Sequence, residues 1–409
     1  MRALAAALAV ILAAPLAAQD QPAWRRVDAA TGQIADVAGL EQLARDFPDS
    51  GSVHVRLLLA QLAAGEIDAA LESLAWLKAR GYVFSAAAQG QIADRIGPDR
   101  AAAARGLLLP KAEAVEASEV VATVPPEAGV IESVYVPEGS TGVYIATSVT
   151  QQTLFMATAQ GGFAMDIPDG ADDLSGVAKT SDPREVWLAS SNIDGSTDDE
   201  PGFSGLIGFI KDQRGAVFVP APAGVTVSDL AAGADGTIYA SDPVGGGVHV
   251  KARGAQALAA LVAPGTFRSP QGLAAGADGA MLYVSDYRYG IAMVDLATGA
   301  VFRLPSDVPV LLDGVDNMWL HDGELIAIQN GTSPMRISAF ALSADGRRIV
   351  GHRVLEQAHP GWTEPLGGNL HDGALVYVAT GQWDRYDEGA LREGMTAVPT
   401  AIRRLPLKR

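Results

Sequence analysis

The sequence contains no cysteine among its 409 residues. A chain without thiols forms no disulfide and offers no thiol for lipid attachment, so packing alone must hold the fold together. Basic residues are scarce as well: 30 Lys and Arg stand against 47 Asp and Glu, which gives a formal net charge of −17. Because such a field repels polyanions, we expect no nucleic-acid partner. The acidic balance suits solubility or cation binding.

Long apolar runs are confined to the N-terminus. Arg2 precedes an apolar run over residues 3–16 and the small residues Ala17 and Ala18, which is the pattern of a secretory signal peptide. A membrane anchor needs ~20 apolar residues, and Gln19 interrupts this run too early. We therefore predict cleavage after Ala18, no membrane span, and an exported protein of the periplasm or the extracellular space.

Familiar catalytic motifs are also missing. The sequence has no G-x-S-x-G nucleophile elbow and no phosphate-binding loop. Its six histidines show no spacing typical of a shared metal site. Chemistry must therefore come from residues that lie far apart in the sequence.

A strand–turn–strand pattern recurs along the chain. Residues 269–286 read SPQGLAAGADGAMLYVSD and residues 228–242 read SDLAAGADGTIYASD, and looser copies occupy residues 316–329 and 366–380. Turn residues between apolar runs indicate hairpins, because Gly takes positive φ without a Cβ clash. The turns begin at Glu138, Asp182, Asp235, Asp278, Asp322 and Asp372. Six units of about 43–53 residues, each with room for four short strands, predict an all-β six-bladed propeller.

The closure of this propeller can be predicted from its last blade, which is one strand short. Residues 118–124 (SEVVATV) read as a strand before the first blade. Pairing them with the terminal strand at residues 400–405 would leave no exposed edge. The insertion at residues 191–201 lacks the spacing of an EF-hand calcium loop, and we interpret it as a solvated loop.

The segment before the propeller has a helical pattern. Apolar residues three and four apart predict amphipathic helices, with breaks at Pro48 and Gly65. The two helices around Gly65 resemble one tetratricopeptide-type unit. We predict a small α-helical, tetratricopeptide-like domain over residues 19–109, a linker with the closing strand over residues 110–128, and the propeller over residues 129–409. The helices serve either as a docking surface for a protein partner or as a packed cap.

Polar residues recur where the innermost strands of the blades begin, and these strands line the central channel. Counting six or seven residues back from each turn gives Glu132, Ser175, Ser228 with Asp229, Gln271, Asp316 with Asn317, and Pro365 with Leu366. Three blades offer a carboxylate, and most of the other residues offer an oxygen. A hard divalent cation prefers such ligands. Alternatively, polar strand starts cap backbone groups or hold ordered water.

Two phrases, PQGLA…DG…LYVSD and DNM…DGEL, resemble the gluconolactonase/regucalcin-like (senescence marker protein-like) six-bladed propellers and their paraoxonase relatives. The resemblance covers residues 129–409. It implies a central metal held by a Glu on blade one, the Asn of an N-D pair on blade three, the Asn of a P-N-G on blade four and an Asp on blade five. Glu132 matches the first position, and Asp316, followed by Asn317, matches the last. The other two positions depart from the pattern and carry Ser228-Asp229 and Gln271.

The resemblance implies a metal-dependent hydrolase of a lactone or ester. Calcium is the expected cation, with magnesium, zinc and manganese as alternatives, and Asp316 or Asp229 would orient or deprotonate the attacking water. Asp313 is a rival for the blade-five position, but the distance from Asp316 to the turn at Asp322 matches the other blades. The alternative function is a non-catalytic binding or scaffold propeller of the cell envelope, whose helices dock a partner and whose metal, if any, is structural. Trp383, just beyond the last repeat, belongs either to a rim pocket or to a packed corner.

Overall fold

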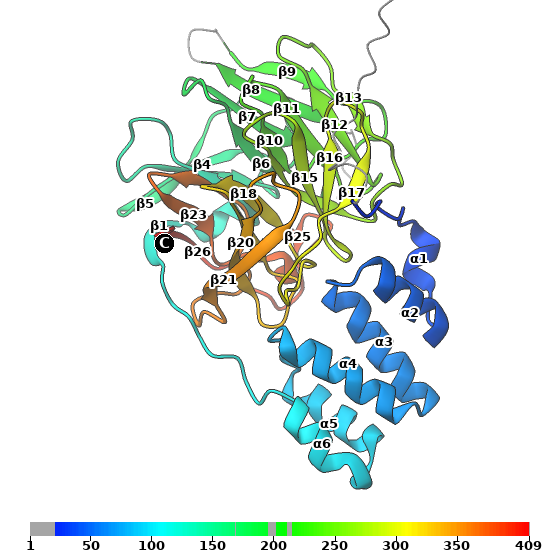
Figure 1. The fold of residues 1–409 in the computed structure, drawn as a ribbon. Helices are drawn as coiled ribbons and strands as arrows, with labels where there is room; N and C mark the ends of the chain where they lie inside the picture. The colour runs from blue at the N-terminus through cyan, green and yellow to red at the C-terminus, as the bar shows by residue number, and fades with distance from the viewer. Residues whose placement is uncertain (1–20, 168, 195–201, 211–214, 409) are drawn as a thin grey trace, which may run out of the picture.

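The computed structural model describes residues 21–167, 169–194, 202–210 and 215–408. The signal peptide predicted for residues 1–18 lies outside the described residues, as does most of the insertion at residues 191–201. Six four-stranded sheets follow a group of helices, and each sheet is one blade of a β-propeller (Figure 1). The predicted fold class, a six-bladed all-β propeller preceded by helices, is confirmed.

Each of the first five blades is an antiparallel meander that runs outward from the channel. Blade one consists of β2 (Ile131–Tyr135), β3 (Tyr144–Ser148), β4 (Leu154–Thr158) and β5 (Gly161–Met165). Blade two consists of β6 (Leu174–Lys179), β7 (Glu185–Ser190), β8 (Gly205–Ile210) and β9 (Val217–Pro220). Blade three consists of β10 (Leu230–Ala232), β11 (Ile238–Asp242), β12 (Gly247–Lys251) and β13 (Ala259–Val262).

Blade four consists of β14 (Pro270–Ala275), β15 (Met281–Asp286), β16 (Gly290–Asp295) and β17 (Val301–Arg303). Blade five consists of β18 (Asn317–His321), β19 (Glu324–Gln329), β20 (Arg336–Leu342) and β21 (Ile349–Gln357). Blade six combines β22 (Gly368–His371), β23 (Ala374–Val378) and β26 (Thr400–Pro406) with β1 (Glu119–Val124). Between β23 and β26 in the sequence there is a short strand pair, β24 (Tyr386–Asp387) and β25 (Ala390–Leu391). The innermost strands contact one another in the cyclic order β2, β6, β10, β14, β18, β22, so blade two lies opposite blade five.

The seam of the propeller closes as the sequence predicts. β1 pairs antiparallel with β26, from Glu119 opposite Arg404 to Val124 opposite Thr400. The buried carboxylate of Glu356 on blade five fixes the start of this strand, because it accepts hydrogen bonds from the amide and hydroxyl groups of Ser118 at 3.0 and 2.7 Å. The outer strand of the last blade therefore comes from the linker.

The helical segment contains α1 (Ala29–Gln33), α2 (Val37–Asp46), α3 (Gly51–Ala64), α4 (Ile67–Ala79), α5 (Ala86–Ile96) and α6 (Ala101–Leu107). The predicted break at Gly65 is the left-handed C-cap of α3, with φ of 76°. The side chains of Asp36 and Ser50 cap the N-termini of α2 and α3. The tetratricopeptide-like character stays a prediction. Within the described ranges, no helix is long and apolar enough to cross a membrane.

The helices pack against loops of blades three to five, at the end of the blades where the inner strands begin (Figure 1). The amide of Leu312 donates to the Asp49 carbonyl at 2.9 Å, and the Ser50 hydroxyl donates to the Arg288 carbonyl at 2.6 Å. A hydrophobic cluster continues from the helices into the blades and includes Leu40, Leu43, Phe47, Phe267 and Tyr289. Burial of this apolar surface joins the helices to the propeller.

Candidate functional site

Four carboxyl groups lie where inner strands begin. Glu132 is the second residue of β2, and Asp229 and Asp316 immediately precede β10 and β18. Glu364 precedes β22 and forms an isolated bridge with Thr380. Because the inner strands are neighbours around one channel, their first residues converge. We call these four side chains the acid cluster.

The charges of Glu132 and Asp229 interact with the rest of the acid cluster. Burial raises the pKa of Glu132 well above its usual value, and the charges of Asp316, Glu364 and Asp229 raise it further, while a hydrogen bond from Trp383 lowers it. Burial and then the charge of Asp316 likewise raise the pKa of Asp229. Desolvation and like charge both favour the protonated form of a carboxyl group.

Asp316 and Glu364 have pKa values near neutrality. Burial, followed by the charge of Glu364, raises the pKa of Asp316 to about 7, against the opposing effect of hydrogen bonds from Asn330 and Asn317. Burial and the nearby charge of Asp384 raise the pKa of Glu364 to about 7. These two groups can therefore exchange protons at ordinary pH.

The acid cluster leaves acceptor atoms without partners. The Oδ2 atoms of Asp229 and Asp316 are both buried and have no hydrogen-bond partner in the part of the chain that the structure describes. This is costly for a charged oxygen unless a proton or cation lies beside it. Among the described residues, no three His, Cys, Asp or Glu side chains surround one point as metal ligands would. A cation held by Asp229 and Asp316 would thus draw its remaining ligands from amide, carbonyl and water oxygens, as calcium commonly does. The donor set fits a hard divalent cation on those terms.

Two polar contacts support the acid cluster. The indole N–H of Trp383 donates to Glu132 Oε2 at 2.7 Å, and the ring also packs against the hydrophobic cluster shared by blades six and one. The hydroxyl of Tyr287 donates to Asn330 Oδ1 at 2.8 Å, and Asn330 is a hydrogen-bond partner of Asp316. Trp383 is thus a packed corner that also contacts the acid cluster through Glu132. It lines a cavity of about 220 Å³ as well, which no carboxyl group of the acid cluster lines.

Three other predicted positions, Ser228, Gln271 and Asn317, also lie where inner strands begin. Ser228 is half-buried, and its carbonyl accepts a bond of 2.8 Å from the Ser175 hydroxyl. Gln271 is half-buried and donates through Nε2 to Ser269 Oγ at 3.2 Å. Asn317 lies close enough to Asp229 and Asp316 to lower the pKa of both.

Asp313 belongs to the contact with the helices. Its Oδ1 accepts a hydrogen bond of 2.8 Å from the Gly51 amide, and its Oδ2 accepts bonds of 2.7 Å from the amide and the hydroxyl of Ser52. Asp313 therefore caps α3 from the propeller, and of the two rival aspartates it is Asp316 that interacts with the acid cluster.

The sequence pattern missed Glu364, Tyr287 and Asn330. For blade six, counting back from the turn gave Pro365 and Leu366, one and two positions past Glu364. The available signal for Glu364 was its place in the sequence directly before Pro365, one of the two counted residues. Tyr287 and Asn330 lie in loops between second and third strands, for which the repeats carry no signal.

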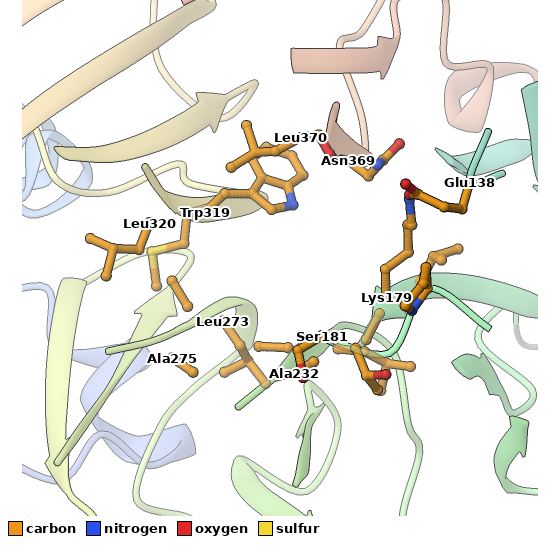
Figure 2. Close-up of a pocket in the computed structure, with 18 residues that line it drawn as sticks. Glu138, Lys179, Ser181, Ala232, Leu273, Ala275, Trp319, Leu320, Asn369 and Leu370 are labelled. Carbon is orange, nitrogen blue, oxygen red and sulfur yellow. Dashed lines mark hydrogen bonds and ion pairs between the residues drawn. The ribbon is translucent and has the colours of Figure 1, made fainter. Parts of the chain in front are cut away.

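A cavity of about 620 Å³ occupies the other end of the channel, near the turns between first and second strands (Figure 2). Its walls come from all six blades and include Glu138, Lys179, Trp319 and Asn369. The carboxyl groups of the acid cluster do not line it. The propeller thus has two distinct polar regions along one channel.

No protein-family model matches the sequence, and no curated protein matches it. Among solved structures, the chain is similar to a gluconolactonase from Xanthomonas campestris, with 16% identity, a TM-score of 0.47 and coverage of 73% of this chain and 99% of that chain. It is also similar to the PQQ-bound aldose sugar dehydrogenase from Streptomyces coelicolor, with 13% identity, a TM-score of 0.45 and coverage of 73% and 99%. A third neighbour is streptogramin B lyase, with 15% identity, a TM-score of 0.42 and coverage of 66% and 77%.

Proposed function

We propose that the acid cluster is the site of a divalent-metal-dependent hydrolase that acts on a lactone or ester. The observation that carries the proposal is the pair of buried, partnerless Oδ2 atoms of Asp229 and Asp316. Asp229 and Asp316 would hold the cation, with oxygens of Ser228, Gln271 and Asn317 as further ligands, and Glu132, which the sequence also suggests as a ligand, would lie beside them as a neighbouring carboxyl group. Calcium suits this mixed carboxylate and amide set best, and magnesium, zinc and manganese are the alternatives to be tested.

When bound, the cation would polarise the substrate carbonyl and lower the pKa of a water molecule. Asp316, whose pKa is about 7 in the cation-free protein, would be ionised beside a bound cation and would accept a proton from the attacking water, while Asp229 would orient that water. The water oxygen bonds to the carbonyl carbon, the ring or ester C–O bond breaks, and the departing oxygen takes up a proton. Glu364 can supply that proton because its pKa is also about 7. The product is a hydroxy acid, or an acid and an alcohol.

The proposal also places the protein outside the cytoplasm. The charged, apolar and small-residue pattern of residues 1–18 supports export to the periplasm or extracellular space. A mature protein that begins at Gln19, observed by mass spectrometry of protein from the native host, is the expected result. Recovery of the intact N-terminus from the cell interior would overturn this placement.

The central experiment measures hydrolysis of a panel of lactones and esters by the metal-free protein, then with calcium, magnesium, zinc or manganese added. Asp316→Asn and Asp229→Asn should each lower kcat/KM by about 100-fold or more, because each removes a proton acceptor or orienting charge. Asp278→Asn is the matched control, since Asp278 is exposed in a turn and its Oδ1 accepts a hydrogen bond from the Ala280 amide of the same turn.

The outcomes separate the candidate functions. Unchanged turnover in Asp316→Asn would refute the assignment of that residue. Calcium binding by calorimetry without turnover of any substrate would favour a structural metal. Neither cation binding nor turnover would favour a binding or scaffold propeller, in which the helices dock a protein partner.

A further inference from the structure

The cavity at the turn end of the channel is built unequally by the six blades. The residue three positions before each turn is, from blade one to blade six, Tyr135, Lys179, Ala232, Ala275, Trp319 and Asn369, and five of these line the cavity. Alanines on blades three and four leave the space that larger side chains occupy elsewhere. A volume of about 620 Å³ falls within the range of small-molecule sites, roughly 300–1,000 Å³.

One wall of the cavity presents a hydrogen-bond donor beside an acceptor. Lys179 Nζ donates to the Val136 carbonyl at 3.0 Å and lies 3.6 Å from Glu138 Oε2. The Glu138 side chain is 57% exposed and that of Lys179 is 18% exposed. An ion pair so exposed on one side is weak, so both groups remain available to a ligand that brings its own donors and acceptors.

The opposite wall is aromatic and rigid. Trp319 belongs to blade five, which faces blade two across the channel, and Figure 2 shows its indole ring extending into the cavity opposite Lys179 and Glu138. The ring also packs against the hydrophobic cluster of blades five and six, which fixes its orientation. Asn369 is held by two backbone contacts, from the Val136 amide at 3.0 Å and to the Leu370 carbonyl at 2.8 Å, so it shapes the wall.

The lining selects the charge of its ligand. Lys179 disfavours a cation, and Glu138 together with the net charge of −17 disfavours an anion. A donor beside an acceptor matches adjacent hydroxyl groups, each of which both donates and accepts. A flat indole face matches the apolar C–H face of a saturated ring, whose area it covers at little entropic cost.

We propose that this cavity binds a neutral polyhydroxylated ring, such as a pyranose sugar, between Trp319 and the Lys179–Glu138 pair. The inference stands apart from the acid cluster, because none of its residues belongs to that site. Sugar binding here and hydrolysis there can each occur without the other.

The test is calorimetric titration of the full chain with glucose, galactose, mannose and maltose, and with gluconate and glucosamine as charged analogues. Saturable binding of a neutral sugar is expected, about ten-fold weaker or more in Trp319→Leu and in Lys179→Gln, which is the loss expected when one well-placed contact is removed. Lys111→Gln is the matched control, because Lys111 is an exposed linker residue. Asp316→Asn should leave sugar binding unchanged, which locates the sugar away from the acid cluster.

A variant that fills the cavity keeps the test decisive if Trp319→Leu fails to fold. Ala232→Leu adds volume from the spacious side and should abolish binding while thermal melting stays cooperative. Absence of saturable binding by every neutral sugar, tighter binding of gluconate or glucosamine, or binding that survives both Ala232→Leu and Lys179→Gln would each overturn the proposal.

Discussion

At the scale of single residues, Asp229 combines burial with an acceptor oxygen that has no partner. The residue is 6% exposed, no described residue donates to its Oδ2, and the charge of Asp316 repels its own charge. A buried carboxylate without compensation lowers the free energy of unfolding, and replacement by a neutral group relieves that cost. Sites that bind cations tolerate this cost because the ion offsets it.

Asp229→Asn should therefore stabilise the cation-free protein at about pH 8, by roughly 1–3 kcal/mol in the free energy of unfolding. The gain should be smaller at about pH 5, because the raised pKa of Asp229 increasingly favours its protonated form in the folded protein as pH falls. Urea unfolding with a chelator at both pH values measures it.

The matched control for this prediction is Asp278→Asn, which changes an exposed acid and should leave stability within about 0.5 kcal/mol. Loss of stability in Asp229→Asn at about pH 8 would contradict the interpretation, since it would mean that the carboxylate makes favourable contacts in the folded protein.

The sequence could indicate which acids converge only where the repeat is regular. Asp229 and Asp316 each lie six residues before the Asp of their turn, and counting back from the turn found both. Glu364 lies eight residues before Asp372, outside the window of six or seven residues that was counted. Trp383 lies between β23 and β26, outside every repeat, so no spacing could place it beside Glu132.

At the scale of elements, the N-terminus of α3 holds the loop that leads into β18. Asp313 accepts the three hydrogen bonds described from Gly51 and Ser52, and the Gly314 amide donates to the Tyr287 carbonyl at 2.7 Å. The Tyr287 hydroxyl in turn reaches Asn330, the partner of Asp316. The helices thus connect to the acid cluster through hydrogen bonds that are joined by the backbone at Asp313 and Gly314 and by the side chain of Tyr287.

Asp313→Ala should lower the free energy of unfolding by about 2–4 kcal/mol, because it leaves buried donors of α3 unpaired. It should also increase amide hydrogen exchange at residues 311–317 and at the start of α3. Hydrogen-exchange mass spectrometry measures both segments in one experiment.

The matched control is Asp36→Ala, which removes the cap of α2 within the helical segment. It should cost about 1 kcal/mol and leave exchange at residues 311–317 unchanged. Equal protection of those residues in both variants would show that α3 does not hold this loop.

Local patterns predicted these elements better than they predicted their docking. The breaks at Pro48 and Gly65 followed from side-chain chemistry that acts over a few residues. The bond between Gly51 and Asp313 joins positions 262 residues apart, and nothing in either local sequence specifies it. The distance to the turn at Asp322 favoured Asp316 over Asp313 for the metal site, but nothing in the sequence showed that Asp313 caps α3.

At the scale of the whole molecule, the closure of the propeller could be predicted because each blade is expected to have four strands. Blade six lacked one strand and residues 118–124 supplied it, so the pairing of β1 with β26 followed from the repeat alone. The pH dependence of stability is a property of the same scale, because it sums over buried groups in several blades.

Buried carboxyl groups contribute most of the pH dependence of stability near neutral pH. Burial is the main cause that raises the pKa of Asp49 and Asp286 to about 6, and of Asp173, Asp316 and Glu364 to about 7. A carboxyl group whose pKa is raised on folding contributes stability that is complete below its unfolded pKa and is lost as pH rises through its folded pKa.

Two buried histidines act in the opposite direction, at lower pH. Burial and then the nearby charge of an arginine (Arg80 for His54, Arg336 for His352) lower the pKa of each imidazole to about 4. Below about pH 6.5 these two imidazoles therefore bind protons in the unfolded chain but not in the folded chain. Their contribution alone lowers the free energy of unfolding.

With a chelator present, the free energy of unfolding should rise as pH falls from about 8 to about 6, by about 1.4 kcal/mol per pH unit for each extra proton bound by the folded state. The rise should become less steep below about pH 6.5, where the two histidines titrate in the unfolded chain, and it should end near pH 4, where the carboxyl groups of the unfolded chain also take up protons. Calcium at about 100 times its dissociation constant should add about 2.7 kcal/mol at pH 8 and flatten the slope, because the cation replaces protons at Asp229 and Asp316. Urea unfolding across this range, with and without calcium, measures both effects.

Two outcomes would contradict this prediction. If the free energy of unfolding changes with pH equally steeply with and without calcium, the cation does not bind at the acid cluster. If stability falls steadily from pH 8 downward, the pKa values of the buried carboxyl groups are not raised.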